Sequence, residues 1–179
     1  IGNKAFYNCS SLKTIAIPQA TTSIGEDAFY NCDSLTNVII PNSVTTLGAS
    51  AFRDSNNLSN VTLSENLTTI NYYTFSGCTG LKNISIPASV TTIGDKAFYN
   101  CSSFSEISIP DKVTSIGFSA FEGCSGVTKL YIGESVKSIG FSAFNGLSKI
   151  TTAKVPDSAT GIEEGAFSGC SSLYSITIP

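Results

Sequence analysis

Residues 81–101 read LKNISIPASVTTIGDKAFYNC, and this stretch decides the fold because the whole chain is built from versions of it. The same features recur 23 residues away in either direction. They are a short run of alternating apolar and polar residues, a turn residue such as Pro87, then Ile-Gly or a close variant, and Ala-Phe in most copies. Across eight copies the spacing of the main landmarks never changes. A fixed period of this length is the signature of a solenoid, in which each repeat stacks on its neighbours.

Three positions of the repeat hold only apolar side chains. In chain order the three columns are Ile1, Ile24, Leu47, Ile70, Ile93, Ile116, Ile139 and Ile162; Phe6, Phe29, Phe52, Phe75, Phe98, Phe121, Phe144 and Phe167; and Leu12, Leu35, Leu58, Leu81, Phe104, Val127, Ile150 and Leu173. A single copy cannot bury its own apolar side, whereas stacked copies turn each column into an internal ladder spaced by about 4.8 Å. We therefore expect one right-handed solenoid over residues 1–179, with about eight coils of 23 residues.

The local elements follow from the same phrase. Runs such as NISIP at 83–87 and EISIP at 106–110 alternate with a period of two, which predicts half-buried parallel strands closed by a turn residue. The acidic residues between Ile-Gly and Ala-Phe predict one or two helical turns. A column restricted to residues that tolerate positive φ predicts a left-handed cap after those turns. Its members are Asn8, Asn31, Asp54, Gly77, Asn100, Gly123, Gly146 and Gly169.

One column is rich in cysteine. It holds Cys9, Cys32, Cys78, Cys101, Cys124 and Cys170, with Ser55 and Leu147 at the two remaining places. An even number of cysteines allows a disulfide reading, and neighbouring coils are close enough to be bridged. In a straight ladder the thiols do not surround one point, so four of them cannot coordinate a metal ion. The chain has no histidine, which is the usual base for a nucleophilic thiol. We interpret the column as a ladder of buried free thiols and expect no disulfide, metal site or catalytic cysteine.

Composition excludes several functions. The net charge is −3, the pI is about 4.8, and no block of Lys or Arg occurs, which argues against nucleic acid as a partner. No apolar run approaches the roughly 20 residues of a membrane helix, so we expect no membrane insertion by this segment. The sequence has no His, no recurring carboxylate pair and no phosphate-cradling loop, so we expect neither an enzyme nor a bound cofactor.

The phrase L-x-x-I-x-I-P-x-x-V-T-x-I-G-x-x-A-F-x-x-C, complete in Leu81 to Cys101, resembles the BspA-like, or Treponema-pallidum-type, leucine-rich repeat. The resemblance covers the whole chain in eight in-phase copies. Departures are local and leave the period intact. Ser64 and Gly133 replace the strand-end proline, Asn71 and Glu163 replace the glycine, and Ala153 weakens a strand.

This resemblance implies a leucine-rich-repeat solenoid of the α/β repeat type, with a parallel β-sheet on the concave face and short helical turns on the convex side. It also implies a cell-surface or secreted protein of host-associated bacteria or some protists. Such proteins are linked to adhesion, including binding of extracellular-matrix and plasma proteins such as fibronectin and fibrinogen. The missing initiator methionine suggests a segment of a longer polypeptide.

Two clusters are candidates for binding. On the outward strand positions, the later coils bring together Glu106, Lys129, Tyr131 and Lys154, a composition typical of binding hot spots but also of a solvated sheet face. After the glycine column lie Tyr72, Tyr73, Phe118 and Phe141. These aromatics form either an exposed convex interface or additional core folded over the coil edge.

The leading hypothesis is a protein-binding module that recognises a host matrix or plasma protein through the concave sheet. The alternative is a structural spacer that presents another domain and has no ligand of its own. Open coils at both ends also favour end-to-end or side-by-side association of the isolated segment.

Overall fold

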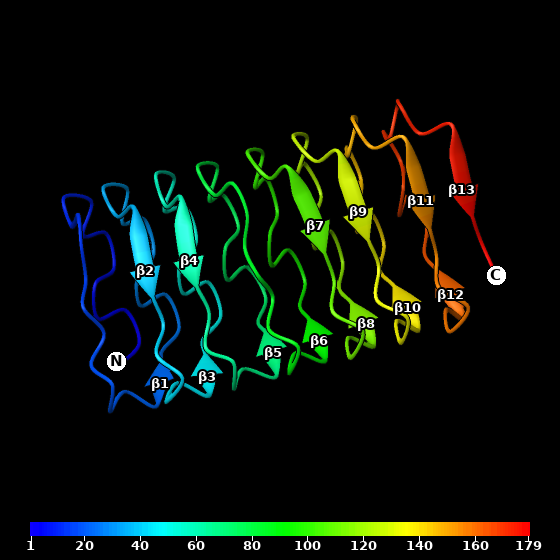
Figure 1. The fold of residues 1–179 in the computed structure, drawn as a ribbon. Helices are drawn as coiled ribbons and strands as arrows, with labels where there is room; N and C mark the ends of the chain where they lie inside the picture. The colour runs from blue at the N-terminus through cyan, green and yellow to red at the C-terminus, as the bar shows by residue number, and fades with distance from the viewer.

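The computed structural model describes all residues from 1 to 179 and shows coils stacked in a row, with the two termini at opposite ends (Figure 1). Two sets of strands run through the coils. The three-residue strands are β2 (Asn37–Ile39), β4 (Asn60–Thr62), β7 (Glu106–Ser108), β9 (Lys129–Tyr131), β11 (Thr152–Lys154) and β13 (Ser175–Thr177). The two-residue strands are β1 (Ser23–Ile24), β3 (Thr46–Leu47), β5 (Thr69–Ile70), β6 (Thr92–Ile93), β8 (Ser115–Ile116), β10 (Ser138–Ile139) and β12 (Gly161–Ile162).

All strand pairs are parallel and join residues one repeat apart, as in Ser108 with Tyr131 and Ile70 with Ile93. This register confirms the predicted solenoid, which makes seven complete turns and a partial eighth. The two-residue strands form a five-stranded sheet in the order β12-β10-β8-β6-β5, preceded by the pair β1-β3. The three-residue strands form the separate pairs β2-β4, β7-β9 and β11-β13. We call the surface of the three-residue strands and of the equivalent residues 14–16 and 83–85 the strand face; it is turned toward the viewer in Figure 1.

The expected helical turns are absent, and the segments around the phenylalanine column are chains of tight turns instead. Along these segments, backbone amides donate hydrogen bonds alternately to the next coil and to their own coil. The amides of Phe6 and Asn8 donate to Ala28 O and Tyr30 O in the next coil, each at 2.8 Å, whereas Cys9 N–H donates back to Phe6 O at 3.1 Å. This convex side, which we call the turn face, is therefore a third inter-coil ladder.

Backbone conformation explains why no helix forms there. The predicted positive-φ column is confirmed at all eight positions, from Asn8 at 58° to Gly169 at 68°. A second column four residues earlier is also left-handed, and it comprises Lys4, Asp27, Ser50, Tyr73, Lys96, Ser119, Ser142 and Gly165. A left-handed residue inside the segment interrupts the right-handed helical path, and the freed amides bond to the adjacent coil instead.

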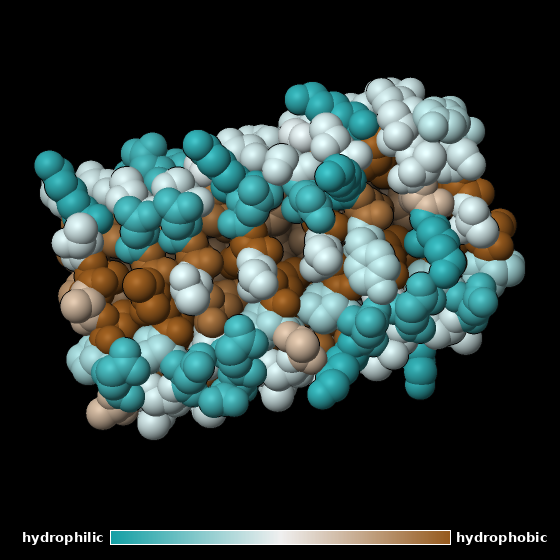
Figure 2. All heavy atoms as spheres, in the orientation of Figure 1, coloured by the Kyte–Doolittle hydropathy of each residue, from teal (hydrophilic) through white to brown (hydrophobic).

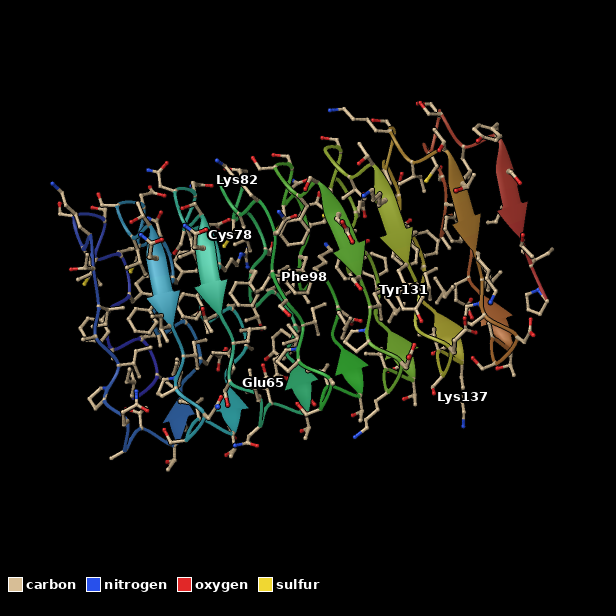
Figure 3. The ribbon with its side chains drawn as sticks, viewed as in Figure 1. Glu65, Cys78, Lys82, Phe98, Tyr131 and Lys137 are labelled. Carbon is tan, nitrogen blue, oxygen red and sulfur yellow. The ribbon has the colours of Figure 1, made fainter.

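The core is a set of ladders, as the columns predicted. The rings from Phe29 to Phe144 in the phenylalanine column are fully buried, and successive ring centroids lie 5.1–5.7 Å apart in stacked geometry. Phe98 in the middle of the stack is labelled in Figure 3. At the two ends, Phe6 and Phe167 are only partly buried because each has one coil neighbour. The structure contains no helix long and apolar enough to cross a membrane.

Candidate functional site

The strand face presents every residue that the alternation placed outward. The three-residue strands β2, β4, β7 and β11 share one burial pattern, with an exposed residue on each side of a buried one. In the register of β7 and β9, Glu106 lies beside Lys129 and Ser108 beside Tyr131. Tyr131 is 45% exposed on this face and is labelled in Figure 3.

Two carboxylates that sequence reasoning missed hold the candidate residues in place. Tyr131 Oη donates to Asp111 Oδ1 at 2.7 Å, and Lys154 Nζ donates to Glu134 Oε1 at 3.0 Å. Asp111 and Glu134 occupy one column, 23 residues apart, just beyond the strand ends. Each partner precedes the residue it binds by 20 positions, so both contacts reach back one coil. A search for carboxylates at that offset from Tyr131 and Lys154 would have found them.

These contacts shift the ionisation of the groups involved. The hydrogen bond from Tyr131, followed by the amide of Glu134, lowers the pKa of Asp111. The hydrogen bond to Asp111 raises the pKa of Tyr131, and the bond to Glu134 raises that of Lys154. Each shift favours the protonation state that makes the contact at neutral pH. The site at pH 7 therefore consists of a neutral phenol and a protonated amine, each docked on a carboxylate.

The other two predicted residues are adjacent but unpaired. Glu106 and Lys129 face each other in the parallel register, yet the three ion pairs of the chain do not include either of them. Glu106 and Lys129 are therefore neighbouring exposed charges whose side chains are not in ion-pair contact. The four predicted residues therefore lie in three neighbouring coils. Tyr131 and Lys154 are each bound to a carboxylate, whereas Glu106 and Lys129 lie side by side without forming an ion pair.

An exposed apolar residue on the strand face was not predicted as functional. Ile39 is 68% exposed although it lies between two coils that flank it on both sides. Hollows of about 420 Å³ and 310 Å³ adjoin it, the first reaching Ile15 and the second Leu63. Figure 2 shows apolar surface along the middle of the strand face, bordered by hydrophilic side chains on both edges. The sequence does contain an indication of this residue: Ile39 occupies an outward strand position at which the other coils have mainly small polar residues.

On the turn face, the aromatic cluster is half exposed and is not additional core. Phe118 and Phe141 are 42% and 43% exposed and stack with centroids 5.6 Å apart. Tyr72 is 50% exposed and meets Tyr73 edge to face at 6.3 Å. Lys96 Nζ links the two pairs, because it lies 5.6 Å from the ring centroid of Tyr73 and 5.2 Å from that of Phe118. Cation–π contacts of this kind add a weak attraction between Lys96 and the two rings.

The cysteine column is structural. All six thiols are free, and five are buried, with Cys9 exposed in the first coil. Each buried Sγ lies near a phenylalanine carbonyl 26 residues earlier, at 3.0 Å for Cys78 to Phe52 O. Ser55 makes the same contact to Phe29 O at 2.9 Å, whereas Leu147 fills its place in the column with a buried apolar side chain. Burial raises the pKa of the Cys32 thiol to about 11 and that of Cys78 further, which removes the reactive thiolate at neutral pH.

The fold and site define a class: a parallel solenoid of 23-residue leucine-rich repeats that displays an exposed sheet. The model of the BspA type leucine rich repeat region, which spans six copies, matches residues 1–125 and 91–179. The chain belongs to this family, whose repeats are generally protein-interaction modules without enzymatic activity. No curated protein matches the chain.

Solved bacterial structures show the same fold. A leucine-rich repeat protein from Bacteroides ovatus is 32% identical, with a TM-score of 0.83 over 88% of this chain and 41% of that protein. The leucine-rich repeat protein of Treponema pallidum is 29% identical, with a TM-score of 0.78 over 85% and 71%. A leucine-rich cell surface protein from Faecalibacterium prausnitzii is 26% identical, with a TM-score of 0.64 over 98% and 62%. The chain thus spans less than half of the Bacteroides protein.

Proposed function

We propose that this chain is the protein-binding part of a cell-surface or secreted protein and recognises a host matrix or plasma protein through its strand face. The family supports protein interaction in general. The similar protein from Faecalibacterium prausnitzii is described as a cell surface protein, which supports the location. We assign binding to the strand face, and not to the turn face, because of the side chains that the later coils place on it.

The observation that carries the proposal is the docking of Tyr131 and Lys154 onto carboxylates of their own chain. Both side chains remain 45% or more exposed, with the Lys154 side chain at 59%. A side chain that is already held in one conformation loses less entropy when a partner covers it. Tyrosine is one of the residue types that contribute most of the binding energy at protein interfaces.

A spacer function is the second candidate, and one feature favours it. The strand-face positions of the first four coils carry no charged residue, so half of the face lacks the charge pattern of the later coils. A spacer needs only the stacked core, which continues through all coils. Under this alternative the chain would have no ligand of its own.

Solid-phase binding to immobilised fibronectin and fibrinogen tests the proposal. The wild-type chain is compared with Tyr131→Ala/Lys154→Ala, and with Phe118→Ala as a control that removes an exposed aromatic from the turn face. We expect saturable binding that the double variant loses and the control keeps, with unchanged circular dichroism for all three. Absence of saturable binding to either protein, or equal binding by the double variant, would overturn the proposal.

A further inference from the structure

We propose that the strand face binds its protein partner as an extended polypeptide segment lying along the solenoid axis, across the strands. This inference rests on the proposed function and specifies the form of the ligand. The segment carries an aliphatic side chain for Ile39 and, about six residues away, an acidic side chain for Lys129. Three features of the strand face support it: a row of amide side chains, a series of hollows, and a change from uncharged to charged surface.

The amide row consists of Asn37, Asn60 and Asn83, which occupy equivalent exposed positions in three successive coils. Asn60 Nδ2 donates to Asn37 Oδ1 at 2.7 Å and to Ser59 Oγ at 3.2 Å. Ser105 Oγ donates to Asn83 Oδ1 at 2.9 Å. These contacts fix the amides but leave Asn60 Oδ1 free to accept and the Nδ2 group of Asn83 free to donate. An extended peptide offers both N–H and C=O groups along one edge, so it can satisfy both.

The backbone of the fourth coil adds further free groups to this row. Residues 83–86 form no strand, and none of their amides or carbonyls takes part in a backbone hydrogen bond. A hollow of about 290 Å³ opens at this point and is lined by Asn83, Ser85, Glu106 and Ser108 among others. These unpaired groups lie between the coils of β4 and β7, so the hollow beside Asn83 is a gap in the strand face where an extended ligand can approach the amide row.

The hollows beside Ile39 give the ligand an apolar anchor. Together with the hollow at Asn83 they follow one another along the axis, between the first and second, second and third, and fourth and fifth coils. Ile39 stands between the first two, so an aliphatic side chain inserted on either side covers it. Covering an isoleucine that is 68% exposed removes apolar surface from water without rearranging the chain.

The distribution of charge on the strand face determines which end of the ligand lies over the early coils and which over the later ones. From Thr14 to Ser85 the strand-face positions are uncharged, and beyond them come Glu106 and then Lys129, neither of which is in an ion pair. Ile39 and Lys129 are four coils apart, about 19 Å at the inter-strand spacing. An extended chain advances about 3.3 Å per residue, so about six residues span this distance. The complementary segment is uncharged near its aliphatic residue and charged at its other end, where an acidic side chain lies opposite Lys129 and no second acidic side chain lies opposite Glu106.

Selection of a phage library of random linear dodecapeptides on the immobilised wild-type chain tests the inference. Enriched peptides are synthesised, and their affinities are measured for wild type, for Ile39→Ser/Asn60→Ala/Asn83→Ala and for Lys129→Ala. The matched control is Phe118→Ser/Asn145→Ala, which removes similar residues from the turn face. Near-ultraviolet circular dichroism checks that each variant is folded, and the asparagine side-chain amide signals are followed by NMR during titration.

We expect enriched peptides that share an aliphatic and an acidic residue about six positions apart. They should bind the triple variant at least tenfold more weakly, bind the control as tightly as wild type, and shift the amide signals of Asn37, Asn60 and Asn83. Failure to enrich any peptide, or enriched peptides that bind the triple variant as tightly as wild type, would overturn the inference.

The outcome is separable from that of the proposed function. If fibronectin or fibrinogen binds through Tyr131 and Lys154 while no peptide depends on the amide row, the strand face binds protein but not in extended form. If the peptides behave as expected while neither host protein binds, the extended mode stands and the assignment of the host ligand is wrong.

Discussion

Truncating the central ring of the phenylalanine ladder should be among the most damaging single changes in this chain. Phe98 is fully buried, stacks on Phe75 at 5.5 Å and on Phe121 at 5.1 Å, and also touches Phe104 at 5.6 Å. Replacing a buried phenylalanine by alanine costs about 3–5 kcal/mol, and each aromatic pair adds about 0.5–1.5 kcal/mol to burial alone. Because the substitution removes the contacts of Phe98 with three aromatic rings at once, we expect Phe98→Ala to lower the free energy of unfolding by about 4–5 kcal/mol.

Urea denaturation followed by circular dichroism measures this loss. Phe118→Ala is the matched control, because its ring is 42% exposed and has one stacked neighbour on the turn face. We expect the control to lose about 1 kcal/mol. Equal losses for the two variants would refute the reasoning, since they would mean that the ladder contributes no more than surface stacking.

Other predictions concern the turns, the thiols and the docked phenol. Ser142 has a φ of 53°, so Ser142→Gly should raise stability by about 0.5–1 kcal/mol, whereas Ser138→Gly in β10 should lower it by a similar amount, both by urea denaturation. Of the six thiols only Cys9 is exposed, so Ellman's reagent should label one thiol in the native chain and all six after denaturation. The raised pKa of Tyr131 means that its contact stabilises the fold below the unfolded tyrosine pKa of about 10, and that this stabilisation is lost as pH rises through the folded value. Asp111→Asn should therefore lower the pKa of Tyr131 toward its ordinary value, as measured by NMR titration of the ring carbon that bears the hydroxyl.

The ladders and the first left-handed column could be predicted from sequence because their positions admit few residue types. Only Asn, Asp and Gly occur from Asn8 to Gly169, and only they tolerate positive φ readily. The second left-handed column, which includes Lys96 and Tyr73, contains residues with no such preference. Its conformation accompanies hydrogen bonds to the next coil and not a residue preference, so composition could not reveal it, and helical turns were wrongly expected.

The candidate site was predictable only in part for a similar reason. Alternation along the strand identified Tyr131 and Lys154 as outward residues, because side-chain direction in a strand has a period of two. Their partners Asp111 and Glu134 depend on how far a side chain reaches back across a coil. The stacking distance and the side-chain conformations, rather than the repeat, decide those contacts. Ser55 shows the same limit, since its replacement of cysteine is explained only by the bond to Phe29 O.

The most direct test of the central claim is hydroxyl-radical footprinting of the chain, alone and with saturating fibrinogen, read at Ile39 and Tyr131 on the strand face and at Phe118 on the turn face. All three side chains are more than 40% exposed in the free chain, so each reports on coverage. The account predicts that fibrinogen protects Tyr131 and Ile39 and leaves Phe118 unchanged. Protection of Phe118 alone, or no protection at Tyr131, would contradict it.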